Sequence, residues 1–154
     1  SGRHEFEAAP LISAKVCEAD FTEDMIDHET ARKVYLEYGL VTADGLHANK
    51  GTILFVKPKH FEFLDPDIKV EAVDQPAGIL LTIKARAYAK SVQLALKDAD
   101  CKFSDNYFDL SANETKRIEV KKDTLSQPMD TGEFRRQLSV RSIFDIASAE
   151  PKVG

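Results

Sequence analysis

Short apolar runs with a period of two are the feature that most constrains the fold of this chain. In residues 78–87, for example, Ile79, Leu81 and Ile83 alternate with other residues. Alternate residues of a strand point to the same face, so such a run places one face on a core and the other toward water. The longest apolar runs are strand-length, far short of the roughly 20 residues of a membrane-spanning helix. The pattern therefore predicts an all-β protein.

Seven strands of this kind are predicted in the C-terminal two-thirds of the chain. Proline, glycine, aspartate and asparagine separate them at residues 74–78, 111–114 and 128–132, as expected for turns. This number and spacing favour an immunoglobulin-like antiparallel β-sandwich over residues 59–154. The predicted strands are residues 68–73, 78–87, 91–96, 101–103, 107–110, 116–120 and 133–141.

Residues 1–58 contain fewer strand signals. Residues 34–40 alternate apolar and other residues, Asp44-Gly45 suits a turn, and residues 51–56 return, which predicts a hairpin. Thr22 is a candidate N-cap for a short helix over residues 23–31. About three strands cannot close a sandwich of their own. We therefore interpret residues 1–58 as the terminal strands of a partial preceding β-sandwich, or as an extension packed on the second domain.

The composition excludes several classes of function. Acidic residues outnumber basic ones by 26 to 21, giving a formal charge of −5, and no basic stripe is present to neutralise a phosphate backbone. Nucleic acid is therefore not an expected partner, and the absence of long apolar runs argues against a membrane partner. The chain also has no repeating βα units, nucleophile elbow or glycine-rich phosphate loop. We expect no active site in this chain.

Metal and redox sites are also not expected. The histidines are scattered, so they lack the spacing of a zinc site. Cys17 and Cys101 are too few for a disulfide scaffold, and we predict two buried reduced thiols, with a bridge as the alternative. No cofactor is predicted. The location of the protein is left open, with the cytoplasm favoured over secretion.

One short motif combines aromatic and polar residues. The side-chain oxygens of Asp105, Asn106 and Asp109 could ligate calcium, but these residues lack the dense acidic spacing of a calcium loop. We interpret Asp105 and Asn106 as turn residues that bond to backbone, and Tyr107 as a candidate tyrosine corner whose hydroxyl bonds to nearby backbone. No catalytic, substrate-binding or metal-binding residue is assigned. The predicted structural motif consists of Phe103, Asp105, Asn106, Tyr107, Phe108 and Asp109.

Three segments of the chain resemble the C-terminal region of β-mannosidases of glycoside hydrolase family two. They are this motif, the segment 55–61 followed by Asp65-Pro66, and the ending 138–145. The resemblance implies a parent protein with a catalytic (β/α)₈ barrel and a preceding sandwich domain, which would be the partners of this region. It also implies retaining hydrolysis of terminal β-mannosides by two barrel glutamates. Neither glutamate maps onto this sequence, so the resemblance implies a non-catalytic accessory domain that supports the barrel.

Two other functions stay open at this point. A carbohydrate-binding module would present exposed aromatic rings; the chain has no tryptophan, but Tyr35 and Tyr88 are candidates for an outer face or a loop. A free-standing immunoglobulin-like interaction domain is the other alternative. A reading frame that continues upstream into a barrel would eliminate this last possibility.

Overall fold

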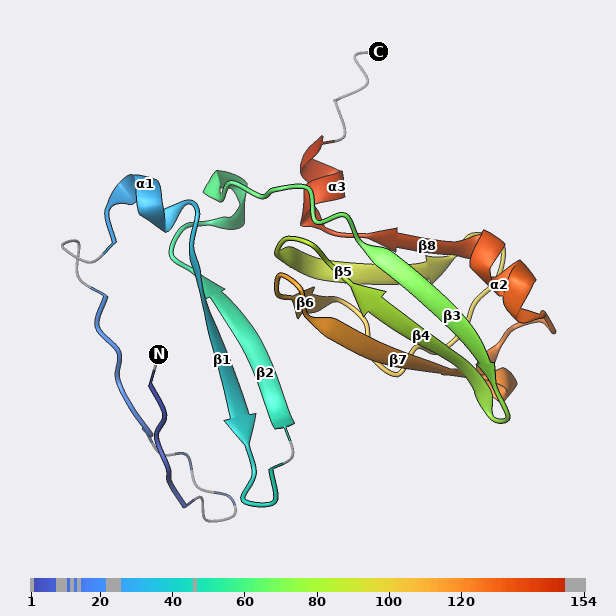
Figure 1. Cartoon of the computed structure of the whole chain (residues 1–154), viewed down its shortest axis with the longest axis horizontal. Coiled ribbons are helices and arrows are strands. Elements are labelled where there is room, and N and C mark those ends of the chain that lie inside the picture. The colour runs from blue at the N-terminus through green and yellow to red at the C-terminus, as the bar shows by residue number, and fades with distance from the viewer. Residues whose placement is uncertain are drawn as a thin grey trace.

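A hairpin and a six-stranded sandwich are the two main parts of the described structure. The computed structural model describes residues 2–7, 11, 13, 15–21, 26–45 and 47–148. The hairpin consists of β1 (Tyr35–Val41) and β2 (His47–Leu54), paired antiparallel. It lies beside one end of the sandwich, and the connection passes through a 3₁₀ turn, η1 (Pro58–His60) (Figure 1). The predicted all-β class and the predicted hairpin are confirmed.

Two three-stranded antiparallel sheets form the sandwich. The first has the order β3–β4–β7, and the second has the order β6–β5–β8. The six strands of the sandwich are β3 (Lys69–Gln75), β4 (Gly78–Lys84), β5 (Ala89–Leu96), β6 (Phe108–Leu110), β7 (Thr115–Lys121) and β8 (Leu138–Arg141). The immunoglobulin-like sandwich predicted from the sequence is confirmed.

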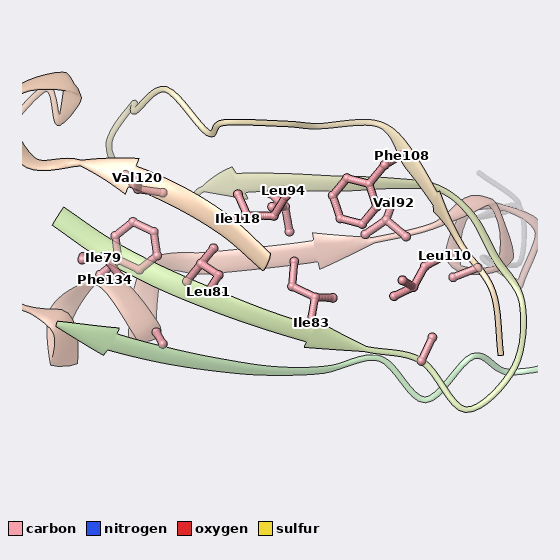
Figure 2. Packing of buried hydrophobic residues seen from close by; sticks show 13 residues of the cluster. Ile79, Leu81, Ile83, Val92, Leu94, Phe108, Leu110, Ile118, Val120 and Phe134 are labelled. Atoms are coloured by element: carbon pink, nitrogen blue, oxygen red, sulfur yellow. The ribbon is translucent and has the colours of Figure 1, made fainter. Parts of the chain in front are cut away.

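The core lies between the two sheets. Leu81 and Ile83 of β4 are fully buried, and Thr82 between them points to the other face. Figure 2 shows these side chains opposite Val92 and Leu94 of β5. Burial of each such aliphatic side chain contributes about 1.5–3 kcal/mol to folding. The alternation read from the sequence therefore fixes which face of β4 is buried.

The predicted strand over residues 133–141 is wrong in its first half. Residues Thr131–Gln137 form a helix, α2, and only Leu138–Arg141 pair as β8. The side chain of Asp130 caps the helix by accepting a hydrogen bond from the backbone N–H of Glu133 at 2.7 Å. An N-cap followed three residues later by glutamate starts a helix, a signal that competes with the turn interpretation of residues 128–132. The helix buries Phe134 completely in the core.

Two smaller predictions also need correction. Residues 101–103 form no strand; Phe103 makes one isolated bridge with Val120. The N-terminal helix, α1, covers only His28–Ala31, and its cap is Asp27, which accepts a hydrogen bond from the backbone N–H of Thr30 at 2.7 Å. The candidate cap Thr22 lies outside the described residues. Two further short elements, η2 (Lys122–Thr124) and α3 (Ile143–Ser148), complete the described chain.

The two cysteines differ in environment. Neither takes part in a disulfide, as predicted, but Cys17 is exposed and only Cys101 is half-buried. Cys17 lies in residues 15–21, which form no helix or strand, so the prediction of two buried thiols is wrong for this residue. Burial, together with the nearby charge of Asp100, raises the pKa of Cys101 to about 11. Among the described helices, none has the length and apolarity needed to cross a membrane.

Candidate functional site

The motif at residues 103–109 leads into the edge strand β6. Phe108 points into the core and is 8% exposed, whereas Tyr107 is 64% exposed. The Asp105 carboxylate lies 2.6 Å from Lys116 Nζ, and this ammonium group also lies 4.7 Å from the centre of the Phe108 ring. The motif therefore joins the β6 edge to β7 through one lysine.

Asn106 takes the place of a residue in the β5–β6 ladder. Its Oδ1 accepts a hydrogen bond from the backbone N–H of Leu94 at 2.8 Å, and its Nδ2 donates to the Leu94 carbonyl at 2.9 Å. Val92 pairs with Phe108, so Leu94 would next pair with Asn106 in a regular antiparallel ladder. The side-chain amide makes the two bonds that a backbone peptide would make. It therefore closes the edge of β5 at a point where β6 has not yet begun.

The prediction of a tyrosine corner at Tyr107 is wrong. The Tyr107 hydroxyl accepts a hydrogen bond from the side-chain Nε2 of Gln93 at 3.3 Å, and it has no backbone partner in the described structure. Its backbone has a positive φ of 60°, at the point where the chain passes from Asn106 into β6 at Phe108. The ring is therefore presented to solvent.

Asp109 is the centre of a junction between the hairpin and the sandwich. Its carboxylate accepts hydrogen bonds from the Thr52 hydroxyl on β2, the Tyr88 hydroxyl at 3.1 Å and the backbone N–H of Ser91 at 2.9 Å. Lys90 Nζ lies 3.0 Å from the same carboxylate, and both side chains are about four-fifths buried, at 20% and 18% exposure. One buried charge thus joins groups that are distant in sequence.

The charge of this carboxylate is stabilised by its donors. Burial opposes ionisation of Asp109, but hydrogen bonds from Thr52, Ser91 and Lys90 outweigh it and hold the pKa of Asp109 below its ordinary value. Burial raises the pKa of the neighbouring Tyr88 phenol, which therefore stays protonated. At neutral pH the junction contains one anion, one cation and two hydroxyl donors, which is a fully satisfied polar network.

A second polar contact links the hairpin to the turn before β7. Lys50 Nζ lies 2.9 Å from the Glu37 carboxylate and 2.8 Å from the Glu114 carboxylate. The Ser111 hydroxyl donates a hydrogen bond to Glu37, and this bond, with the one from Lys50, lowers the pKa of Glu37. Both strands of the hairpin are therefore held to the sandwich.

Aromatic rings fill the space beside the Asp109 junction. Tyr35 of β1 stacks on Tyr88 with 4.1 Å between ring centroids, and Phe61 and Phe63 of the connecting segment lie 6.0 and 6.2 Å from Tyr88. Tyr88 is 7% exposed. Of the two placements predicted for Tyr35 and Tyr88, the outer face is wrong, because both rings pack between hairpin and sandwich; Tyr88 does lie in a loop, the one before β5.

Sequence reasoning identified Asp109 but missed most of its partners. Thr52 and Tyr88 lie 57 and 21 residues before Asp109 in the chain. Threonine, tyrosine and lysine have no local pattern that indicates a shared partner, so only the tertiary fold brings them together. The three possible calcium ligands of the motif have other partners: Asp105 and Asp109 each pair with a lysine, and Asn106 bonds to the backbone of Leu94. No group of three potential metal ligands occurs in the described ranges.

Comparison with protein families agrees with the two-part structure. The model of a mannosidase Ig-fold domain family matches residues 63–146, and the model of a mannosidase Ig/CBM-like domain family matches residues 1–60. Both domains are found in the C-terminal regions of β-mannosidases. Comparison with curated proteins gave no match. The matched ranges meet near the boundary predicted between residues 58 and 59, and the boundary itself stays a prediction.

Proposed function

The chain belongs to the Ig-fold domain family of mannosidases, and from this membership we propose that it is a non-catalytic accessory region of a β-mannosidase-type glycoside hydrolase. The parent enzyme would hydrolyse terminal β-mannosides with retention of configuration. That chemistry needs two carboxyl groups about 5–5.5 Å apart, one as acid/base and one as nucleophile. The junction at Asp109 offers one carboxylate, which is engaged by Lys90, and it therefore supports a structural role.

The observation that carries the proposed role is the bonding of the hairpin to the sandwich. The Asp109 network and the Tyr35–Tyr88 stack fix the hairpin through buried contacts of both polar and apolar kinds. Interfaces within a chain are otherwise expected to permit relative motion. We propose that this junction sets the position of the hairpin-bearing domain relative to the sandwich in the parent enzyme.

The outer face of the hairpin supports a proposal about residues 1–58. Leu36 pairs with Ile53 across the hairpin, and the apolar side chains Tyr38, Leu40 and Ile53 are 51%, 42% and 49% exposed. A two-stranded hairpin is marginally stable alone, and an apolar face of this kind requires cover. We propose that further strands of the parent's preceding sandwich cover it, with an extension of the Ig-like domain as the alternative.

Enzyme assays test the non-catalytic assignment. The purified chain is expected to give no turnover of a chromogenic β-mannoside, while the full-length parent hydrolyses it. Turnover that copurifies with the isolated chain and survives Asp109→Asn would point to another active site and overturn the proposal. In the parent, Asp109→Asn is expected to lower the melting temperature without changing the KM. A parent whose KM rises while its melting temperature is unchanged would argue for a direct role in substrate binding.

A further inference from the structure

A basic hollow lies at the end of the β3–β4–β7 sheet where β3 begins and β4 ends (Figure 1). The first residue of β3, Lys69, pairs directly with the last residue of β4, Lys84. These strand ends and the loop before β7 surround a depression of about 330 Å³, which is lined by Asp67, Lys69, Lys84, Ala85, Arg86 and Asn113. Three of these side chains are cationic and one is anionic. The hollow therefore has a net charge of +2 on a chain whose total charge is −5.

The two lysines form a like-charge pair across the sheet. Side chains directly opposite in an antiparallel ladder have Cβ atoms about 4.5–5.5 Å apart, so two ammonium groups placed there repel each other. On its other side Lys84 pairs with the uncharged Thr115 of β7. Glu71 shares this face of β3, but it forms no ion pair with either lysine within the described ranges. An anion bound between the lysines would remove the repulsion.

The cationic groups of the hollow are largely available to a ligand. Neither Lys84 nor Arg86 forms an ion pair in the part of the chain that the structure describes. The one carboxylate of the lining, on Asp67, lies 3.8 Å from Lys69 Nζ, and the two side chains are 46% and 77% exposed. Such an exposed and distant pair contributes little, so Lys69 can turn to a stronger anion.

Backbone hydrogen bonds hold the walls of the hollow together. The Arg86 N–H donates to the Pro66 carbonyl at 2.7 Å, and the Asn113 N–H donates to the Ala85 carbonyl at 2.8 Å. Asp67 and Asn113 have positive φ angles of 41° and 63°, a conformation that aspartate and asparagine tolerate better than bulkier residues. The backbone thus fixes the three segments without using the cationic side chains.

The charge and the donors of the hollow suit a phosphate group. A phosphate monoester carries a charge of about −1.5 to −2 at neutral pH and has three acceptor oxygens. It would therefore neutralise the charge of the hollow, whereas a single carboxylate would neutralise only half of it. Arginine binds phosphate through its planar fork of N–H groups, and lysine binds it as a point charge. The hollow combines both kinds of donor with the side-chain amide of Asn113.

We propose that this hollow binds a phosphate group, either as inorganic phosphate or as the phosphomonoester of a small molecule. The Arg86 guanidinium and the ammonium groups of Lys69 and Lys84 contact the phosphate oxygens, and the Asn113 amide donates a further hydrogen bond. Binding is weak, because the cations are exposed and water screens their charge. The inference does not rest on the proposed accessory role, since every binding group belongs to the sandwich.

Amide-resolved NMR of the whole chain, titrated with inorganic phosphate at constant ionic strength, tests the proposal. Saturable shifts are expected at residues 67–69, 84–86 and 113. Arg86→Gln is expected to weaken binding about tenfold, the effect of losing one charge-assisted contact. A titration with methyl phosphate separates the two sources of the group. Saturation by both ions would support a site for phosphomonoesters, and saturation by inorganic phosphate alone would support a site for the free ion.

The variant Lys84→Glu gives a second readout. Glutamate opposite Lys69 replaces repulsion by attraction, so the variant should be at least as stable as the unsubstituted chain and should not bind phosphate. Phosphate also stabilises folded proteins in general, because it is excluded from their surface. The readout is therefore the difference between the two chains. Added phosphate should raise the urea midpoint of the unsubstituted chain more than that of Lys84→Glu.

A control variant and a further titration decide the outcome. Lys121→Gln removes a lysine from the opposite end of the same sheet, where it pairs with Gly78, and should leave the phosphate titration unchanged. Absence of saturable shifts overturns the proposal, and so do shifts that persist in both Arg86→Gln and Lys84→Glu. Equal saturation by acetate would show that the hollow does not select a phosphate group, and would also overturn it. None of these outcomes alters the mannoside assay of the proposed accessory role.

Discussion

The ring of Tyr35 on β1 stacks on the ring of Tyr88, with 4.1 Å between centroids and 18° between planes. Tyr88 immediately precedes β5, so this stack crosses from the hairpin to the sandwich. The Tyr88 hydroxyl also lies 2.6 Å from Thr52 Oγ1 of β2. One buried tyrosine therefore contacts both strands of the hairpin, by its ring on one side and by its hydroxyl on the other.

Removing the Tyr35 ring should release the hairpin without unfolding the sandwich. Tyr35→Ala loses the stack and part of its buried area, which should weaken docking by about 2 kcal/mol. Hydrogen exchange should then accelerate at the β1 and β2 amides, while amides of β4 stay protected. Tyr38→Ala on the same strand removes an exposed ring and serves as the control. Equal protection of the hairpin in both variants would show that the stack does not hold it.

Stability should fall at acidic pH through Asp109. Its pKa is lower in the folded protein than its ordinary value of about 3.9, so its contribution to stability is complete above that pH. The contribution is lost as pH falls below about 3.9 and through the folded pKa, because the folded state then takes up a proton against its hydrogen-bond donors. Urea denaturation between neutral pH and acid should show this loss.

The variant Asp109→Asn should remove the same contribution at neutral pH. An amide leaves Lys90 without its partner in a site where both side chains are mostly buried, which costs about 2 kcal/mol. Asp74→Asn is the matched control, since its pair with Lys122 is 64% and 51% exposed and contributes little. The loss of stability in acid should be smaller in Asp109→Asn than in the unsubstituted chain. An unchanged pH dependence would mean that other carboxyl groups cause it.

The β5 edge should depend on the Asn106 side chain. Asn106→Ala leaves the N–H and carbonyl of Leu94 without these partners, and losing them should cost about 2 kcal/mol in unfolding free energy. Asn106→Asp keeps an acceptor for the N–H but places a negative charge against the carbonyl, so it should not rescue the loss. Asn49→Ala is a control, because among the described residues the Asn49 side chain bonds to the adjacent Lys50 N–H alone. Rescue by aspartate would show that the carbonyl bond is dispensable.

Local patterns in the sequence account for the sandwich but not for its exceptions. The alternation around Leu81 predicts strand, face and burial together, because all three follow from one period of two. Phe134 also fits an alternating run, but the capping bond at Asp130 favours a helix there, and both states bury the ring. Where two secondary structures satisfy the same apolar pattern, the cap decides between them.

The junction was less accessible to sequence reasoning. Asp109 could be selected for its place in a motif, and Asn106 for its turn propensity, but neither residue reveals its partner. The partner of Asn106 is the backbone of Leu94, which any residue could supply. Thr52 and Asp109 meet only because the hairpin docks on the sandwich. Contacts between units depend on tertiary geometry, which no local period encodes.

Replacing each of two glycines by alanine should affect stability differently. A Cβ on Gly78 would collide with the backbone carbonyl of Val120, because β4 and β7 approach closely at their shared end. Relief requires the two strands to separate, so Gly78→Ala should cost about 2–3 kcal/mol. A Cβ on Gly51 would meet the phenol ring of Tyr38, an exposed side chain that can rotate away. Gly51→Ala should therefore change stability by less than about 0.5 kcal/mol.

The stability of both glycine variants can be measured by urea unfolding, monitored by the loss of the sheet signal in circular dichroism. The midpoint of Gly78→Ala should shift to lower urea at an unchanged slope, since the surface exposed on unfolding stays the same. The unfolding curve of Gly51→Ala should superimpose on that of the unsubstituted chain. Equal destabilisation of both variants would mean that strand propensity, rather than the contact with Val120, governs the response. A stable Gly78→Ala would mean that β4 and β7 lie farther apart at this end than the register implies.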